Sequence, residues 1–507
     1  MSLLLRNVNS NMQVFVLKLV MTFVLTPIML RHLGNYDYGI WEILGSVVGY
    51  MGLLDMGLSP TVSRFIARYR AKSNKDRLNQ VYNTSLGLMA LAGVIAGGAL
   101  ILWGIFLPES IAPPGSTNIP RYSLVLMIVG IQLLFTFPGI VLISSMEGIQ
   151  RFKEKNDIVI LTSLVGSIII LQFIDGQNAL ILIALTNMVG GAIKYIYYFF
   201  YLRNSSETVL KLSRAGLSMP MVRELLHFGG KSFIQGTSHR VSQYADNLVI
   251  SFFSGTASIV FFAIPNALLR HILSLIANIT SAFLPFFSDK SAKGDTHSIT
   301  RVYIFASKIT VAITFLLLSG IIVLGDDFIR LWIGSDYAIK GRWVLYILSA
   351  YVLIHTINPF DNRLVTALAR HGYFAKMSIV ESVGNITCSL ILAPIYGIEG
   401  VALGTLIPSF FVKVYTLRYC CALISIPPAE YIRSCIITNL IPALLVVVFL
   451  LTAVFFHEIT GYFWLLLYAG LSCIIWLPSV LFIVFSKSER HSIFQFLARD
   501  NQNPNPK

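Results

Sequence analysis

The 507-residue chain has little charge. Asp, Glu, Lys and Arg make up 12% of its residues, hydrophobic residues make up 55%, and the mean hydropathy is +0.73. A soluble domain of this size needs more charge to cover its surface. Apolar stretches of about 20 residues recur instead, and this length crosses a bilayer as a helix. We therefore predict an all-α polytopic membrane protein, since runs such as GLMALAGVIAGGALILWGIFL exclude a transmembrane β-barrel.

Cysteine and catalytic motifs are also scarce. The five cysteines fall in or beside apolar segments without metal-ligand spacing, and we expect small buried hydrophobes rather than disulfides: Cys388, Cys420, Cys421, Cys435 and Cys473. The sequence has no nucleophile elbow and no phosphate-binding glycine loop. The chain is therefore expected to be neither an enzyme nor a metal or cofactor binder.

Acidic residues are fewer than basic ones, 24 against 38, which gives a net charge of +14. Membrane proteins collect Lys and Arg in cytoplasmic loops, so this excess does not indicate a nucleic-acid partner. Fourteen spans are predicted, near residues 12–30, 38–58, 81–107, 122–145, 158–174, 179–202, 228–253, 258–287, 302–324, 343–360, 373–393, 398–419, 434–456 and 461–485.

Charge alternates between the predicted loops. One set, with both termini, carries 24 of the 38 cations, and the other carries four: Arg31, Arg330, Lys340 and Arg342. The positive-inside rule places both termini in the cytoplasm, here under a plasma (inner) membrane. The longest outer loop is expected at residues 325–342. Short outer loops argue against a membrane enzyme that transfers glycans.

Matches at a constant offset of 221 residues indicate a duplication, for example Gly34 with Gly255 and Pro138 with Pro359. Each half holds six spans, an even number, so the halves enter the membrane in the same orientation. The predicted parts are a six-helix lobe with linker at 1–227, a second lobe at 228–425, two further helices at 426–485 and a cytoplasmic tail at 486–507. Paired lobes favour alternating access over an open pore.

Three segments carry a resemblance to a known family. They are PIMLRHLGNYDYGIWEILGSVVGYMGLLDMGL, ANITSAFLPFFSD and PIYGIEGVALGTLIPSFF. They resemble the polysaccharide, or O-antigen, flippases of the multidrug/oligosaccharidyl-lipid/polysaccharide exporter superfamily over residues 6–425. The resemblance implies a V-shaped pair of lobes and the flipping of a polyprenyl-diphosphate-linked oligosaccharide, with a glycan polymerase and glycosyltransferases in the same pathway. Asn266 stands where the lipid II branch typically has Arg, and Arg270 follows one turn later.

Charged side chains near the middle of a span are costly and usually face a watery interior. The candidate residues for binding the diphosphate and sugars combine such cations with polar neighbours: Arg240, Arg270, Lys231, Lys18, His239, Gln235 and Gln243. Arginine suits phosphate oxygens because its guanidinium is a planar fork. Some of these groups could instead bond only to neighbouring helices.

Intramembrane acids are the candidates for coupling to an ion gradient, namely Glu381 and Asp246. The family-like motif marks Gly34, Gly39, Asp55 and Gly57 as structural, with Asp55 expected at a turn or a contact between lobes. The alternatives are a multidrug or metabolite antiporter, which would favour an acidic and aromatic cavity, a glycan-transferring enzyme and a non-transporting scaffold.

Overall fold

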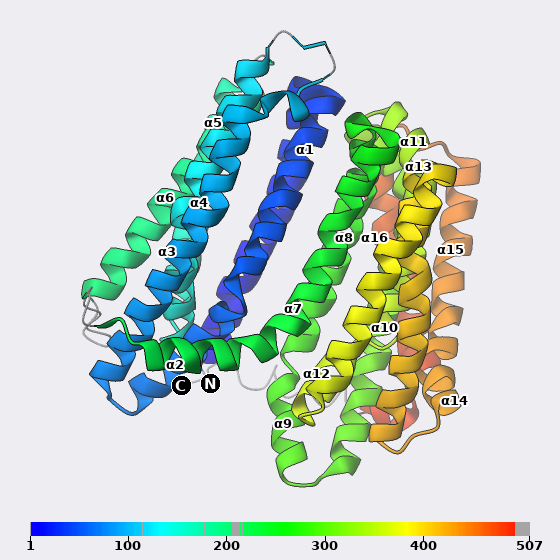
Figure 1. The fold of residues 1–507 in the computed structure, drawn as a ribbon. Helices are drawn as coiled ribbons and strands as arrows, with labels where there is room; N and C mark the ends of the chain where they lie inside the picture. Colours follow the sequence, from blue (N-terminus) through cyan, green and yellow to red (C-terminus); the bar gives the residue numbers. More distant parts are fainter. Residues whose placement is uncertain are drawn as a thin grey trace. The chain divides into compact units, whose positions relative to one another are not determined.

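The computed structural model describes residues 2–113, 115–116, 118–176, 178–204, 213 and 216–491, which are helical with short connections and hold no strand. The chain divides into two compact units (Figure 1), unit 1 at residues 1–260 and unit 2 at residues 261–507. Hydrophobic helices in such number make the chain a multi-pass membrane protein.

The described part of unit 1 contains seven α-helices and three 3₁₀ turns. They are α1 (Ser2–Met51), η1 (Gly52–Asp55), α2 (Leu58–Ala71), α3 (Lys75–Phe106), η2 (Pro108–Ser110), α4 (Ile119–Gly148), α5 (Phe152–Phe173), α6 (Ala179–Asn204), α7 (Met219–Ser254) and η4 (Thr256–Ser258). Helix α3 packs along α4, α4 along α6, and α1 against both α5 and α7.

Unit 2 begins within α8 (Ile259–Ser281). Its further elements are α9 (Leu284–Ala292), α10 (Thr296–Trp332), α11 (Ser335–Thr356), α12 (Asp361–Ala367), α13 (His371–Leu423), α14 (Pro428–Tyr431), η5 (Ile432–Ile437), α15 (Thr438–Phe456), α16 (Tyr462–Ser479) and η6 (Val480–Val484). An aromatic cluster including Phe287, Tyr303 and Phe360 joins α9, α10 and the start of α12.

Eleven segments of the described chain are long and apolar enough to cross a membrane. Two of them, Ser10–Asp55 and Gly372–Leu423, have 46 and 52 residues, about twice the length that a bilayer needs. Each breaks at a glycine with positive φ, Gly34 (69°) and Gly397 (60°), and so accounts for two crossings. With α7 added, the count is the fourteen crossings predicted from the sequence.

A turn with the same hydrogen bonds occurs in each of the two units. The N–H of Ser73 donates to Arg70 O at 2.9 Å, and that of Gly294 donates to Ser291 O at 3.1 Å. The next residues, Asn74 and Asp295, cap α3 and α10 by accepting a backbone N–H at 3.0 Å. Corresponding residues of these turns are 221 positions apart, the offset that the sequence predicts.

A later turn keeps the same geometry at a different offset. Gln150 and Ala369 both have positive φ, 61° and 56°, and the residue after each donates its N–H five positions back at 2.9 Å. They are 219 positions apart, so two residues are lost between the turns and the ungapped repeat predicted from the sequence is wrong here. The predicted domain boundaries at 228 and 425 stay predictions.

The expected long outer loop at residues 325–342 is also wrong. Helix α10 continues to Trp332 and α11 begins at Ser335, which leaves only Ile333 and Gly334 between them. Charges that lowered the local hydropathy are paired on the helices, because Arg342 Nε lies 2.6 Å from Asp326 Oδ2. The connection between α3 and α4, which includes η2, is longer.

Candidate functional site

The second half of α1 closely approaches helix α7 and the turn η4 that follows it. A side chain at Gly39 would place its Cβ 2.1 Å from the carbonyl oxygen of Thr256, and one at Gly49 would meet the ring of Tyr244 at 2.2 Å. Tyr50 Oη donates to Val241 O at 3.0 Å across the same contact. Glycines therefore let α1 support α7, the helix that carries most of the predicted site residues.

The turn between η1 and α2 contacts α7 at a second place. Gly57 has φ 72°, and a Cβ there would lie 2.3 Å from Gly229 O. The buried carboxylate of Asp55 accepts the N–H of Ser59 at 3.0 Å and so holds the first turn of α2. Gly34 lies at the break of α1 described above, where its conformation rather than its surroundings requires glycine.

Arg240 lies on the exposed side of α7 and reaches the turn. Its Nη1 donates to Gly52 O at 2.9 Å, and its charge attracts the carboxylate of Asp55. A single backbone carbonyl engages one of the five N–H donors of a guanidinium. Nearby on α7, Gln243 is exposed and Asp246 is buried.

Three predicted binding residues lie in α7 with their side chains outside the described part of the chain. They are Lys231, Gln235 and His239. Their assignment to a binding site stays a prediction.

Lys18 has a neighbour that the sequence did not identify. Lys18, on α1, is exposed, and Lys194, on α6, lies close enough that the two positive charges repel. Neither lysine forms an ion pair with another described residue. The signal that could have found the pair is two lysines on spans of the same lobe.

Arg270 lies in unit 2, on α8. It is exposed, and among the residues described in that unit it has no hydrogen-bond or ion-pair partner. Its position in a membrane-spanning helix makes such exposure costly unless water or an anion reaches it.

Unit 2 also holds a buried ion pair that sequence reasoning missed. Lys413 Nζ, on α13, lies 2.7 Å from Oδ2 of Asp361, which begins α12. Glu381, partly buried on the first half of α13, also attracts the Lys413 charge. The predicted coupling residue thus shares one lysine with a second acid.

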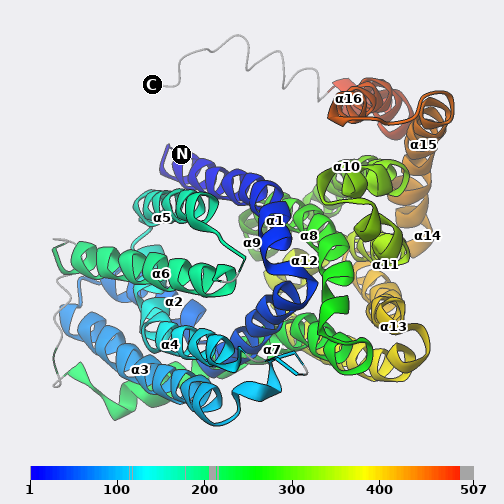
Figure 2. The same cartoon turned by 90° about the horizontal axis from the view of Figure 1, so that it is seen from above.

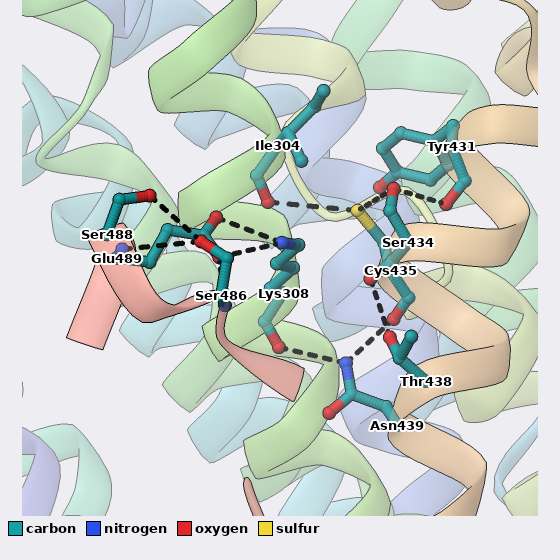
Figure 3. A network of polar contacts seen from close by, with 10 residues as sticks. All are labelled: Ile304, Lys308, Tyr431, Ser434, Cys435, Thr438, Asn439, Ser486, Ser488 and Glu489. Atoms are coloured by element: carbon teal, nitrogen blue, oxygen red, sulfur yellow. Dashed lines mark hydrogen bonds and ion pairs between the residues drawn. The ribbon is translucent and has the colours of Figure 1, made fainter. Parts of the chain in front are cut away.

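Two further cations in membrane-spanning helices, Lys308 and Arg121, have partners in the structure. Lys308 Nζ, on α10, lies 2.9 Å from Glu489 Oε1 in the segment after η6. Figure 3 shows the two side chains pointing toward each other. In unit 1, the guanidinium of Arg121 pairs with the buried carboxylate of Asp37. Neither cation is therefore a candidate for substrate binding.

Among the described residues, no group of three His, Cys, Asp or Glu side chains could hold a metal ion. All five cysteines are free thiols. The chemistry that the described polar side chains offer is charge compensation and hydrogen bonding within a membrane.

Comparison with known proteins gives one family match. The model of a family described as "Polysaccharide biosynthesis protein" matches residues 4–291. A Shigella flexneri protein named "Putative O-antigen transporter" is 23% identical over 389 residues, which are 74% of this chain and 87% of that protein. A Haloferax volcanii protein named "Probable low-salt glycan biosynthesis flippase Agl15" is 26% identical over 32% of this chain and 35% of its own length.

Solved structures share the fold. The lipid II flippase MurJ in an inward closed conformation matches with a TM-score of 0.68 and 17% identity, over 97% of this chain and 99% of that one. An inward-facing multidrug resistance MATE transporter of the MOP superfamily matches with a TM-score of 0.66 and 15% identity, over 80% and 94%. These matches confirm the predicted all-α fold of that superfamily.

Proposed function

Because the chain belongs to the polysaccharide biosynthesis protein family, we propose that it moves a polyprenyl-diphosphate-linked oligosaccharide from the cytoplasmic to the outer leaflet by alternating access. The family resemblance drawn from the sequence is confirmed. Relatives named as an O-antigen transporter and a glycan biosynthesis flippase support this substrate class.

The neighbouring lysines Lys18 and Lys194 carry the proposal. Lys194 loses hydration in a membrane-spanning helix, and the charge of Lys18 on α1 acts against it, so its placement costs free energy without an anion. A diphosphate carries about two negative charges near neutral pH and would compensate both. An organic cation, the substrate expected of a multidrug antiporter, would add to the repulsion.

Arg240, in unit 1, and Arg270, in unit 2, are each further candidates for binding phosphate oxygens. Both side chains are exposed, and one N–H group of Arg240 donates to the backbone carbonyl of Gly52. A guanidinium binds phosphate oxygens through two parallel N–H donors, which a lysine cannot reproduce. Lys231, His239, Gln235 and Gln243 complete the proposed set.

The setting of this function is also part of the proposal. The charge asymmetry of the loops supports a location in the plasma (inner) membrane with both termini in the cytoplasm. The carrier would receive its substrate from glycosyltransferases and pass it to a glycan polymerase, without a catalytic step of its own. Glu381 and Asp246 remain the proposed sites of coupling to an ion gradient.

The test is a flipping assay in proteoliposomes. The probe is the lipid-linked glycan fraction of the source cells, and flipped molecules are measured by the exposure of their sugars to an impermeant glycosidase or lectin. Loss of a charge-assisted contact costs about 1.5–3 kcal/mol, and 1.4 kcal/mol is a factor of ten. Arg240→Ala, Arg270→Ala and the double variant Lys18→Ala/Lys194→Ala are each expected to slow flipping about ten- to hundredfold.

The control variant is Lys72→Ala, which removes an exposed cation between α2 and α3 and should leave the rate unchanged. Arg240→Lys should recover part of the rate, because charge is kept while the planar fork is lost. If all the alanine variants fold and flip the glycan at the wild-type rate, the proposed diphosphate site is wrong. If the wild-type protein instead exports a cationic dye and moves no glycan, the antiporter alternative replaces it.

A further inference from the structure

Unit 1 contains a cavity of about 960 Å³ at the end of α3 and the start of α4. Its walls come from α1, the connection between α3 and α4, and the end of α7, which lie beside one another in Figure 2. The lining combines aromatic rings with hydroxyl groups, chiefly Tyr36, Trp103, Phe252, Ser110, Ser251 and Thr256. None of the proposed diphosphate-binding residues lines it.

Hydrogen bonds fasten the wall that the connecting segment forms. Trp103 Nε1 donates to Ser110 Oγ at 2.7 Å, and that hydroxyl donates to Leu107 O at 2.7 Å. Tyr36 Oη donates to Ile111 O at 3.2 Å. The segment is thus tied to α3 on one side and α1 on the other, so hydrogen bonds within the protein hold this wall of the cavity in place.

A buried polar cluster supports the same end of the unit. Asp37, the residue after Tyr36, accepts from Tyr122 Oη at 2.8 Å and pairs with Arg121 at the start of α4. This links α1 to α4 behind the cavity wall. On the α7 side, the hydroxyls of Ser251 and Thr256 lie 2.9 Å apart.

The lining decides what the cavity can hold. It includes one acid, Glu109, and no Lys, Arg or His, so it offers no counter-charge for a phosphate. The lining hydroxyls already bond within the wall, but each keeps a lone pair that can accept a further hydrogen bond, and a purely apolar acyl chain would leave this acceptor capacity unused. Neutral sugar rings fit both features, because they present C–H faces to aromatic rings and hydroxyls to serine and threonine. The volume lies near the upper end for ligand pockets, about 300–1,000 Å³, which allows more than one ring.

We propose that this cavity binds neutral saccharide rings of the transported glycan, separately from the site that binds its diphosphate. The assignment of the rings to a transported glycan rests on the proposed function. In the proposed orientation the connection between α3 and α4 lies on the outer side, so the cavity would hold sugars that have reached that side.

The experiment measures binding by the full chain in lipid nanodiscs. The probe is the mixture of oligosaccharides that mild acid releases from the lipid-linked glycan fraction of the source cells, fluorescently labelled at the reducing end. The wild-type protein should bind it saturably, and inorganic diphosphate should not compete. Phe252→Ala, Ser251→Ala and Trp103→Phe should weaken binding at least about tenfold.

Phe253→Ala is the matched control. Phe252 lines the cavity and is 81% exposed, whereas its neighbour Phe253 does not line the cavity. The centroids of the two rings lie 4.9 Å apart. Both variants lose that ring contact, and only the first loses a cavity wall. Phe252 is so exposed that its removal should leave folding intact.

No binding by the wild-type protein, or equal affinity of folded Phe252→Ala and Phe253→Ala, would overturn the proposal. The outcome is distinguishable from failure of the proposed function. If flipping depends on the lysines but Phe252→Ala leaves sugar binding unchanged, only the assignment of the cavity is wrong. A protein that binds the released sugars through Phe252 but flips no lipid-linked glycan would leave the cavity as a saccharide site and remove the transport function.

Discussion

The ammonium group of Lys413 lies 2.7 Å from Oδ2 of Asp361, and the two side chains are only 10% and 8% exposed. The pair joins the start of α12 to the second half of α13, 52 positions along the chain. Burial of two charges costs more than their attraction returns unless the geometry is good and further groups satisfy them. Glu381 supplies a second negative charge toward the same lysine.

Replacing one member of this ion pair should destabilise the fold more than replacing both members. Lys413→Met leaves the carboxylate of Asp361 without its partner, and Asp361→Asn leaves Lys413 only the weaker attraction of Glu381. An unpaired buried charge costs about 3–5 kcal/mol, whereas the double variant removes both members of the pair. We expect both single variants to lower the thermal midpoint of the purified protein and the double variant to recover much of the loss. Additive losses in the double variant would show that the two charges do not depend on each other.

Glu381 is the stronger of the two predicted coupling residues because it shares Lys413 with Asp361. Neutralising it in Glu381→Gln should remove the dependence of flipping on a proton or sodium gradient while flipping down the glycan gradient continues. Asp246→Asn is tested in parallel, and Glu430→Gln, at an exposed acid of α14, is the control. A gradient dependence equal to wild type would eliminate Glu381 from this role.

The contact between α7 and the turn after η1 provides a matched pair of neighbouring glycines. A Cβ at Gly229 would lie 2.8 Å from Met56 O, whereas one at Gly230 would meet nothing within 4 Å. Gly229→Ala should destabilise the protein by about 1–3 kcal/mol through overpacking. Gly230→Ala should be neutral or stabilising by up to about 1 kcal/mol, because alanine favours the helix. Equal thermal midpoints for the two variants would contradict the close approach.

Glu489 gives a pH dependence with a definite sign. Burial raises its pKa, but the N–H of Ser486 and the ammonium of Lys308 outweigh this and hold the pKa below its ordinary value of 4.5. A carboxyl with a depressed folded-state pKa stabilises the fold above its unfolded pKa. This stabilisation is lost as the pH falls through the folded-state pKa.

Glu489→Gln should therefore be less stable than wild type at pH 7, by on the order of 1 kcal/mol. The difference should hold down to about pH 4.5 and shrink below it. Thermal midpoints of both proteins measured from pH 7 to pH 3 check this. A difference that grows on acidification would reverse the sign and refute the pairing with Lys308.

The sequence predicted the helices better than the polar contacts within them. Hydropathy located fourteen crossings because each must hide its backbone from lipid over about 20 residues. It failed at residues 325–342, where Arg342 and Asp326 lower the window average although they pair between two helices. The same averaging placed Asp361 in a loop and concealed its partner Lys413.

The sequence identified individual site residues as costly charges within spans, but it did not show which of them lie close to one another. Arg240 and Lys18 stand out in the sequence because a charge in a span is expensive. Lys194 lies 176 positions after Lys18, and Arg121 lies 84 positions after Asp37, so only the fold shows that the first pair repels and the second attracts. Whether the two charges of a pair attract or repel each other, and therefore what role they have, depends on helix packing that periodicity does not specify.

The orientation of the protein in the membrane is the prediction on which the outer position of the saccharide cavity depends. The turns at Ser73 and Gly294 have the same hydrogen-bond pattern. They lie in loops with six and three cations and are expected on the cytoplasmic side. An alkaline-phosphatase reporter folds only outside the cytoplasm, so its fusion after Asp76 or after Thr296 should be inactive. Fusion after Ser116, in the connection between α3 and α4, should be active. A fusion of green fluorescent protein at the same three positions should give the opposite pattern and shows that each fusion is made. Phosphatase activity after Asp76 or Thr296 would invert the topology, place the cavity on the cytoplasmic face and make its sugars those that await transport.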